Sequence, residues 1–418
     1  MKKNIFIFFI IMCFMRGYIS NNFGPLKYSW DLSLFIFQIL LFPDFLKALK
    51  DKNIFIAYVF FLASFLISTI NSLYFNDVSI LYNCLLEFMY INGYWIVICV
   101  LIKSKGMHRS IWRLIFFLSS IQIYFDLLNI EQISRINETL DLFPGTFFMP
   151  NQKSRVLALF LLCLFILIKE RKEKISTLYL LNIITIIISY IIGFSDITYV
   201  LLGLSVLVAL IYIFYKDFRY KNKISIKRKI LIFLISLASV LFVFFKYIKA
   251  ANFGSMYIIY TERFFNPDSG VYGMILYSFR LILESSFLGT GGGTFMGRTA
   301  TSLGSSILEN APSVQVAYGT FTSNTTIDGV SGLLNISVEY GILGLISFIL
   351  LLRIIFKNVF SNKILMIVVS SYIIFIILYT PYFFDNEFGF ISTIIFVLLK
   401  KFFENPVNNF EKDRRLDI

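Results

Sequence analysis

The chain has 418 residues, of which 58% are hydrophobic and 15% are charged, and its formal net charge is +13. Soluble domains contain about 25% charged residues, so this composition excludes an ordinary soluble enzyme or binding domain. The basic excess does not indicate a nucleic-acid partner, because the Lys and Arg residues lie in short segments between apolar runs, where they mark membrane topology and contact lipid headgroups.

Apolar stretches follow one another along almost the whole chain. A stretch of about 18 or more apolar residues can cross a hydrocarbon core about 30 Å thick as a helix. We therefore predict an all-α polytopic membrane protein with about 12 transmembrane helices, in a single integral membrane domain over residues 1–418. The predicted spans are 4–20, 30–46, 54–74, 81–102, 111–128, 154–169, 175–193, 198–215, 230–248, 332–352, 364–380 and 388–402.

The first stretch follows Lys2 and Lys3 and has no small-x-small cleavage site after it, so we expect it to remain as a span. Most of the 38 Lys and Arg residues fall in alternate connecting segments, beginning with the N-terminus. Because cytoplasmic segments carry an excess of basic residues, both termini are predicted to be cytoplasmic, in a multi-pass protein of the bacterial cytoplasmic (inner) membrane. The polar segment 249–331, between the ninth and tenth spans, is then a large extracytoplasmic loop.

Within this loop, residues 273–287 alternate apolar and polar residues at near-helical spacing. That pattern predicts a helix lying on the membrane surface. The run Gly289-Thr-Gly-Gly-Gly293 follows it. Gly291 and Gly292 would let the backbone approach a ligand closely and direct amides at an anion. The alternative is a flexible turn after the surface helix.

Arg263 and Arg280 are the loop residues best suited to bind a phosphate group. An arginine keeps its charge, and its planar fork matches pairs of phosphate oxygens. The alternative for both is contact with lipid headgroups, or ion pairing with Glu262 and Glu284. Arg298 is a weaker candidate of the same kind.

Asp328 and Glu339 flank the point at which the chain re-enters the membrane. A transferase needs a base that takes a proton from the acceptor hydroxyl, and a carboxylate shielded from water suits that task. The alternatives are a helix cap for Asp328 and a structural partner of another helix for Glu339. Glu87 is a further acidic residue, deep within a span.

The sequence offers little for a metal centre. The only histidine is His108, and the four cysteines lie in apolar stretches without a CxxC pair, so we interpret them as small core residues. Asp385-Asn-Glu387 has a spacing suited to a divalent cation, but it lies in the last short outward turn. We expect no metal and no cofactor.

Three features together resemble the O-antigen polymerase and ligase-like family of bacterial membrane glycosyltransferases (Wzy-type). Arg280 precedes Gly289-Thr-Gly-Gly-Gly-Thr-Phe295 by nine residues, similar to that family's arginine and "PLLGxGxGxF" turn. Val338-Glu-Tyr-Gly-Ile-Leu-Gly-Leu345 is similar to its "ExGxxGL" helix start. The third feature is the predicted topology, with one dominant outward loop late in the chain. The resemblance covers mainly residues 255–352.

The resemblance implies an inverting, metal-independent transfer of a glycan from polyprenyl diphosphate to an acceptor hydroxyl. It implies that Arg280 contacts the diphosphate, with Arg263 as a second arginine. Ligase members carry a histidine about nine residues before the glutamate, where this chain has Asp328-Gly-Val-Ser331; this favours a polymerase. The family's Ser-Arg hinge is here Ser195-Asp196, and Arg155 or Arg135 would have to replace the missing arginine.

We therefore interpret the chain as a polymerase of lipid-linked oligosaccharide repeat units for O-antigen or capsular polysaccharide. The expected partners are the polyprenyl-diphosphate-linked donor and acceptor, membrane lipids and, as an optional partner, a chain-length regulator protein; nucleic acid is not one. The alternatives are a polymer ligase, and a lipid-linked oligosaccharide flippase or other transporter. The large loop and the lack of an internal repeat argue against a transporter.

Overall fold

All regular structure that the computed structural model describes is helical. The described residues are 2–23, 29–75, 80–104, 108–128, 146–147, 150–171, 177–192, 198, 201–209, 211–212, 270–295, 307, 331–357, 364–380, 383–384 and 386–404. The helices are α1 (Lys2–Asn22), α2 (Ser29–Ala48), α3 (Lys52–Phe75), α4 (Ile80–Lys103), α5 (His108–Ser120), α6 (Gln122–Leu128), α7 (Pro150–Arg171), α8 (Thr177–Ile192), α12 (Gly270–Glu284), α15 (Gly332–Phe356), α16 (Ile364–Tyr379) and α17 (Glu387–Glu404).

The predicted spans coincide with helices wherever the structure describes them. Residues 201–209, within the predicted span 198–215, are helical, and the span 230–248 lies outside the described residues. The predicted span 111–128 is not one straight helix, because a turn at Ile121 divides it into α5 and α6.

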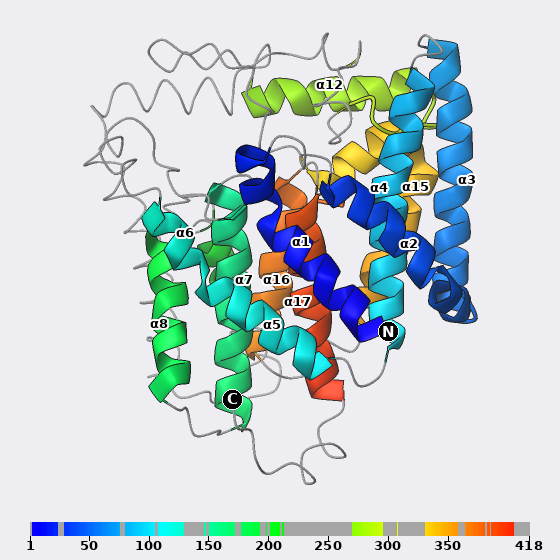
Figure 1. Cartoon of the computed structure of the whole chain (residues 1–418). Coiled ribbons are helices and arrows are strands. Elements are labelled where there is room, and N and C mark those ends of the chain that lie inside the picture. The colour runs from blue at the N-terminus through cyan, green and yellow to red at the C-terminus, as the bar shows by residue number, and fades with distance from the viewer. Residues whose placement is uncertain are drawn as a thin grey trace, which may run out of the picture.

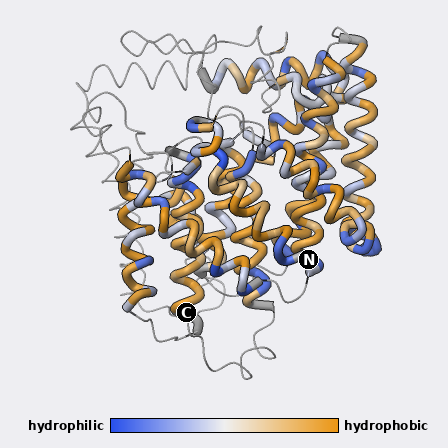
Figure 2. The backbone as a smooth tube through the Cα atoms, viewed as in Figure 1, coloured by the Kyte–Doolittle hydropathy of each residue, from blue (hydrophilic) through white to orange (hydrophobic). Residues whose placement is uncertain are grey.

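Among the described residues, six helices are long and apolar enough to cross a membrane. Figure 2 shows the long helices as predominantly hydrophobic along their length. Large apolar side chains on the outside of α2 and α3 are exposed, among them Leu32, Ile39, Leu66 and Ile70. Such surfaces are unfavourable in water and suit lipid. The described part of the chain is therefore that of a helical membrane protein.

Helices α3 and α15 pack closely against each other. Small side chains allow a close approach: Ser347 Oγ donates to the carbonyl oxygen of Ala57 over 2.8 Å, and Gly344 lies against Ser64. Lipid provides no hydrophobic effect between membrane helices, so the close packing that small residues allow drives helix association instead. Phe61 adds ring contacts, including one with Tyr340.

α12 lies across one end of the bundle and packs against α15 (Figure 1). The prediction of a helix at 273–287 is confirmed, although the helix begins at Gly270 and ends at Glu284. It ends where Ser286 and Phe287 adopt positive φ angles of 52° and 63°, a conformation that an α-helix does not continue through. We refer to this region as the α12 end of the bundle.

At the opposite end, polar contacts tie helix ends together. Lys400 Nζ donates to the carbonyl oxygens of Ile354 and Ile355 over 3.1 and 3.0 Å, which caps the last turn of α15. Lys103 at the end of α4 pairs with Asp51 in the turn between α2 and α3, with Nζ and Oδ2 2.5 Å apart.

Candidate functional site

Helix α15 breaks in its first half, at Gly341, two residues after Glu339. Gly341 has φ 66° and ψ −166°, which is not a helical conformation. A side chain there would be strained, and its Cβ would lie 2.3 Å from the carbonyl oxygen of Phe287. The continuous span predicted for 332–352 is therefore wrong in this respect, because the break depends on the loop that packs against Gly341.

The glycine-rich loop after α12 takes over the hydrogen bonds that the break interrupts. In an unbroken helix, the carbonyls of Val338 and Glu339 would accept from amides four residues later. Instead they accept from the amides of Thr290 and Gly291 over 2.8 and 3.0 Å, and the amide of Ile342 donates to the carbonyl of Phe287 over 3.0 Å. These bonds join the loop and α15 into one substructure. Separating the two would leave backbone groups unbonded away from water, which costs several kcal/mol for each group.

The Glu339 side chain is fully buried in this substructure. Its Oε1 accepts from the amide of Phe295 over 3.0 Å, so the same loop orients the carboxylate. A second carboxylate, that of Glu87 in α4, is also buried. Cys84, one turn before Glu87, is within electrostatic range of both carboxylates and contacts Ser72 with its sulfur 3.8 Å from Oγ.

The glycines in the loop allow it to pack against the protein. A Cβ on Gly289 would lie 2.6 Å from the carbonyl oxygen of Glu339. One on Gly291 would lie 2.5 Å from the Cβ of Ser72, and one on Gly292 2.5 Å from the hydroxyl of Tyr340. The loop is thus a buried, hydrogen-bonded turn. Ligand binding by Gly291 and Gly292 stays a prediction, and the Gly291 amide is already bonded to Glu339.

Arg280 lies on an exposed side of α12, with 73% of its side chain accessible. Its Nε is 2.7 Å from Oε1 of Glu284, four residues later, which is the ion pair that the sequence left open as an alternative. The hydrogen bond to Glu284 raises the pKa of the Arg280 guanidinium. The structure brings Gly291, Gly292 and Glu339 together, but it does not bring Arg280 into contact with Glu339.

Several residues considered from the sequence lie outside the described part of the chain. Among them are Arg135, Asp196, Arg263, Arg298 and Asp328.

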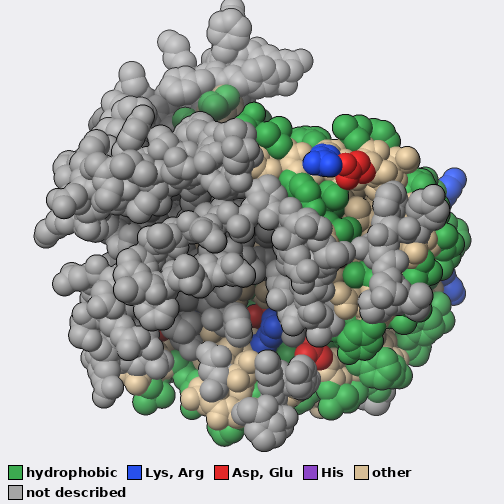
Figure 3. All heavy atoms as spheres, turned by 90° about the horizontal axis from the view of Figure 1, so that it is seen from above, with side chains coloured by type: hydrophobic (Ala, Val, Ile, Leu, Met, Phe, Trp, Pro, Cys, Tyr) green, Lys and Arg blue, Asp and Glu red, His purple; other side chains and the backbone are tan. Residues whose placement is uncertain are grey.

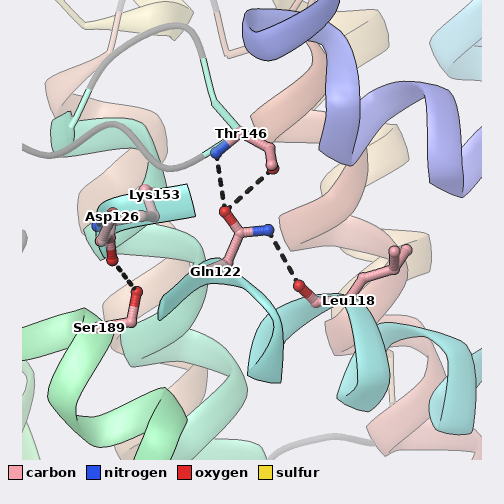
Figure 4. A network of polar contacts seen from close by, with 6 residues as sticks. All are labelled: Leu118, Gln122, Asp126, Thr146, Lys153 and Ser189. Atoms are coloured by element: carbon pink, nitrogen blue, oxygen red, sulfur yellow. Dashed lines mark hydrogen bonds and ion pairs between the residues drawn. The ribbon is translucent and has the colours of Figure 1, made fainter. Parts of the chain in front are cut away.

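A second set of buried polar side chains begins α7, where Gln152, Lys153, Ser154 and Arg155 are all buried. Lys153 Nζ lies 2.7 Å from Oδ1 of Asp126, and the other oxygen of Asp126 accepts from Ser189 over 2.6 Å (Figure 4). A buried ion pair is costly to desolvate, so it is weak evidence for stability and better evidence for a functional region.

Gln122 extends this polar set toward the end of α1. Its Oε1 accepts from the amide and the hydroxyl of Thr146 over 2.9 and 3.0 Å, and its Nε2 donates to the carbonyl of Leu118 over 3.0 Å (Figure 4). The carbonyl of Thr146 in turn accepts from the amide of Tyr18 over 3.1 Å.

Arg155 is completely buried, although arginine carries a permanent charge. Its Nη1 donates to Oγ1 of Thr380 over 2.8 Å. The carbonyl of Thr380 lies beside Gly332, the first residue of α15, at 2.7 Å from the position of a Cβ there. Arg155, which the sequence suggested as a replacement for the missing arginine, is thus linked through Thr380 to the N-terminus of α15.

Arg16 of α1 forms a third polar contact of this kind. It pairs with Glu387 and donates to Oδ1 of Asn386 over 3.2 Å, and its guanidinium carbon is 5.0 Å from the ring centre of Trp30. Glu387 belongs to the acidic pair considered for a cation, and it is engaged by an arginine instead. Asp385 lies outside the described residues.

Sequence reasoning did not include Arg16 or Lys153 in the site. A signal was present: Arg16 interrupts an apolar run, and five polar residues in succession, 151–155, lie at the start of α7. A cation inside a span indicates function by default.

No group of three or more His, Cys, Asp or Glu residues suited to a metal ion occurs in the described ranges. No family model, no curated protein and no solved structure matches the chain.

Proposed function

We propose that the chain is a polymerase of polyprenyl-diphosphate-linked oligosaccharide repeat units at the outer face of the bacterial cytoplasmic membrane. In this proposal about 12 spans cross the membrane, both termini are cytoplasmic, and the loop 249–331 with α12 is extracytoplasmic. One observation carries the proposal. The two stretches that resemble the Wzy-type family, 280–295 and 338–345, pack together through backbone hydrogen bonds around the buried carboxylate of Glu339.

The reaction needs a base and a cation. The acceptor hydroxyl oxygen bonds to the anomeric carbon of the donor glycan while the bond from that carbon to the diphosphate oxygen breaks. The hydroxyl proton passes to the carboxylate of Glu339, with Asp328 as the alternative base. The bonding electron pair leaves with the diphosphate, and displacement from the opposite side inverts the anomeric centre.

Fixed guanidinium groups stabilise the charge that develops on the diphosphate. In this proposal Arg280 and Arg263 bind the diphosphate. The exposure of Arg280 supports its role, since a lipid-linked substrate can reach it by displacing Glu284. The buried guanidinium of Arg155, near the start of α15, is a third candidate.

The direct test uses purified protein in lipid nanodiscs and the lipid-linked repeat units that accumulate in host cells lacking this gene. We expect wild-type protein to form products longer than one repeat. Glu339→Gln should lower the rate by about 10²- to 10⁴-fold, the usual contribution of a general base, because the amide cannot accept the proton but still accepts the bond from Phe295. Asp51→Asn, a carboxyl-to-amide change at the opposite end of the bundle, is the control and should retain activity.

The other outcomes separate the alternatives. Transfer of one repeat to a foreign acceptor would indicate a ligase, and transport across a vesicle membrane without a bond change would indicate a flippase. A Glu339→Gln variant with the wild-type rate would remove Glu339 as the base. Mapping of residues 249–331 to the cytoplasmic side by labelling would contradict the proposal as a whole.

A further inference from the structure

Helix α12 has two apolar sides, and only one of them faces the protein. Met274, Ser278, Leu281 and Ser285 are buried against the bundle. Phe279 and Leu283 are 55% and 64% exposed, and with Tyr272 and Leu276 they form a second row at spacings of four, three and four residues. At 3.6 residues per turn, that row is a single stripe on roughly the opposite side of the helix. We call these four residues the α12 stripe.

The charged residues of α12 lie along one edge of this stripe. Arg280 and Glu284 are four residues apart and form an exposed ion pair. Helical geometry places them about a quarter turn from the α12 stripe and about a third of a turn from the buried row. Viewed from above, the surface carries a basic and an acidic side chain side by side, bordered by hydrophobic ones (Figure 3). The helix thus has a protein side, a polar edge and an exposed apolar side.

The apolar surface continues beyond the helix. Phe287 and Leu288 follow it and are exposed. Asn71 of α3 donates to the carbonyl oxygens of Gly289 and Ser285 over 2.7 and 3.4 Å, so the end of α12 is held against the end of α3. On α3, a candidate membrane span, the neighbouring side chains Leu66, Ile70 and Leu73 are also exposed.

We propose that α12 is an interfacial helix whose α12 stripe lies at the boundary of the acyl chains and headgroups of the bilayer that the bundle spans, with Arg280 and Glu284 among the headgroups. Continuity with the outward face of α3 favours lipid as the occupant over a protein. The polar edge favours the same occupant, because a helix in this boundary needs an apolar side and a charged edge. The proposal does not depend on glycan transfer.

This arrangement has a consequence for the site. The loop after α12 is bonded to both sides of the break in α15, and it orients the carboxylate of Glu339. A helix held at the membrane surface therefore holds Glu339 at a fixed depth below that surface. α12 is in this sense a positioning element for the broken helix.

The test measures the depth of single positions on α12. Cysteines replace Phe279 or Leu283 on the stripe, Glu284 on the polar edge, or Ser278 on the protein side, and each carries an environment-sensitive fluorophore in bilayers of phosphatidylethanolamine and phosphatidylglycerol. The described native cysteines are all buried, and unsubstituted protein measures their background labelling. Lipids with a nitroxide on the acyl chain and aqueous iodide serve as the two quenchers.

We expect the probes at 279 and 283 to be quenched several-fold more by the lipid nitroxide than by iodide, with an apparent depth of about 5–10 Å. The probe at 284 should show the reverse order, and position 278 should label poorly. Stronger quenching by iodide at both 279 and 283 would overturn the proposal. So would lipid quenching that falls as protein density rises, because a second copy of the chain would then cover the stripe. Neither result bears on glycan transfer, which the repeat-unit assay tests separately.

Discussion

The amide of Ile342 donates to the carbonyl oxygen of Phe287 over 3.0 Å, across a helix break at Gly341. Almost the whole segment between α12 and α15 separates the two residues in the sequence, yet their hydrogen bond joins the loop after α12 to α15. Through this bond and its neighbours, a surface helix and a buried carboxylate become parts of the same element. This relationship depends on the glycine at the break.

Gly341→Ala should destabilise the protein by about 1–3 kcal/mol, the usual cost of a side chain at a strained backbone position. The added Cβ would meet the carbonyl oxygen of Phe287, which is backbone and cannot move away easily. Thermal unfolding in detergent, followed by the tryptophan fluorescence of the bundle, measures the loss. Gly93→Ala is a suitable control, because its nearest neighbour is the flexible end of Leu34; equal losses for both variants would contradict the prediction.

The buried pair of Lys153 and Asp126 should respond asymmetrically to substitution. Asp126→Leu alone leaves the Lys153 ammonium buried without its carboxylate, and we expect a loss of about 3–5 kcal/mol. The double variant Asp126→Leu with Lys153→Met should recover most of that loss, since two apolar side chains carry no desolvation cost. Unfolding by denaturant compares the single and double variants. Lys153→Met alone is measured as well. If the loss in the double variant equals the sum of the losses in the two single variants, the pair is not coupled as the structure indicates.

Arg280→Ala should leave the stability almost unchanged, because the residue is exposed and its surface ion pair with Glu284 contributes little. Under the proposed function the same substitution should abolish long polymer in cells. The measurement is a gel of surface glycan together with a blot of the protein. Long-chain polymer at normal protein abundance would contradict the role of Arg280, whereas lost polymer with lost protein would contradict the stability prediction.

Asp51 provides a pH-dependent prediction. The hydrogen bond from Lys103 lowers the pKa of the Asp51 carboxyl from its ordinary value of 3.8. Because the folded-state pKa is depressed, the stabilisation is fully present above 3.8 and is lost as the pH falls through the lower folded-state value. Asp51→Asn should therefore reduce stability at pH 7 by a small amount, since the pair is partly exposed and screened. The difference from wild type should shrink toward pH 3 in unfolding experiments; a constant difference would contradict the linkage.

Much of the fold could be predicted from the sequence, because lipid imposes a simple rule. Each span must be long, apolar and internally hydrogen-bonded, so runs such as 54–74 and 81–102 identify α3 and α4 without knowledge of their neighbours. The helix at 273–287 was predictable from its periodicity in the same way. These are local properties, which depend on residues near one another in the chain.

The site depended on contacts that no local pattern records. Arg280 and Glu339 were both singled out by their residue type, but the structure pairs the first with Glu284 and buries the second under the amide of Phe295. The burial of Arg155 and the pairing of Lys153 with Asp126 depend on helices that meet only after folding.

The sequence by itself determined that this chain forms apolar helices, where most of them begin and end, and that a glycine-rich turn follows an amphipathic helix. Only the tertiary structure decided where α15 breaks and what the glycines contact. The physical reason is that a helix satisfies each backbone group with a partner a few residues away. The break at Gly341 is stable only because the amides of Thr290 and Gly291, distant in the sequence, donate to the carbonyls of Val338 and Glu339.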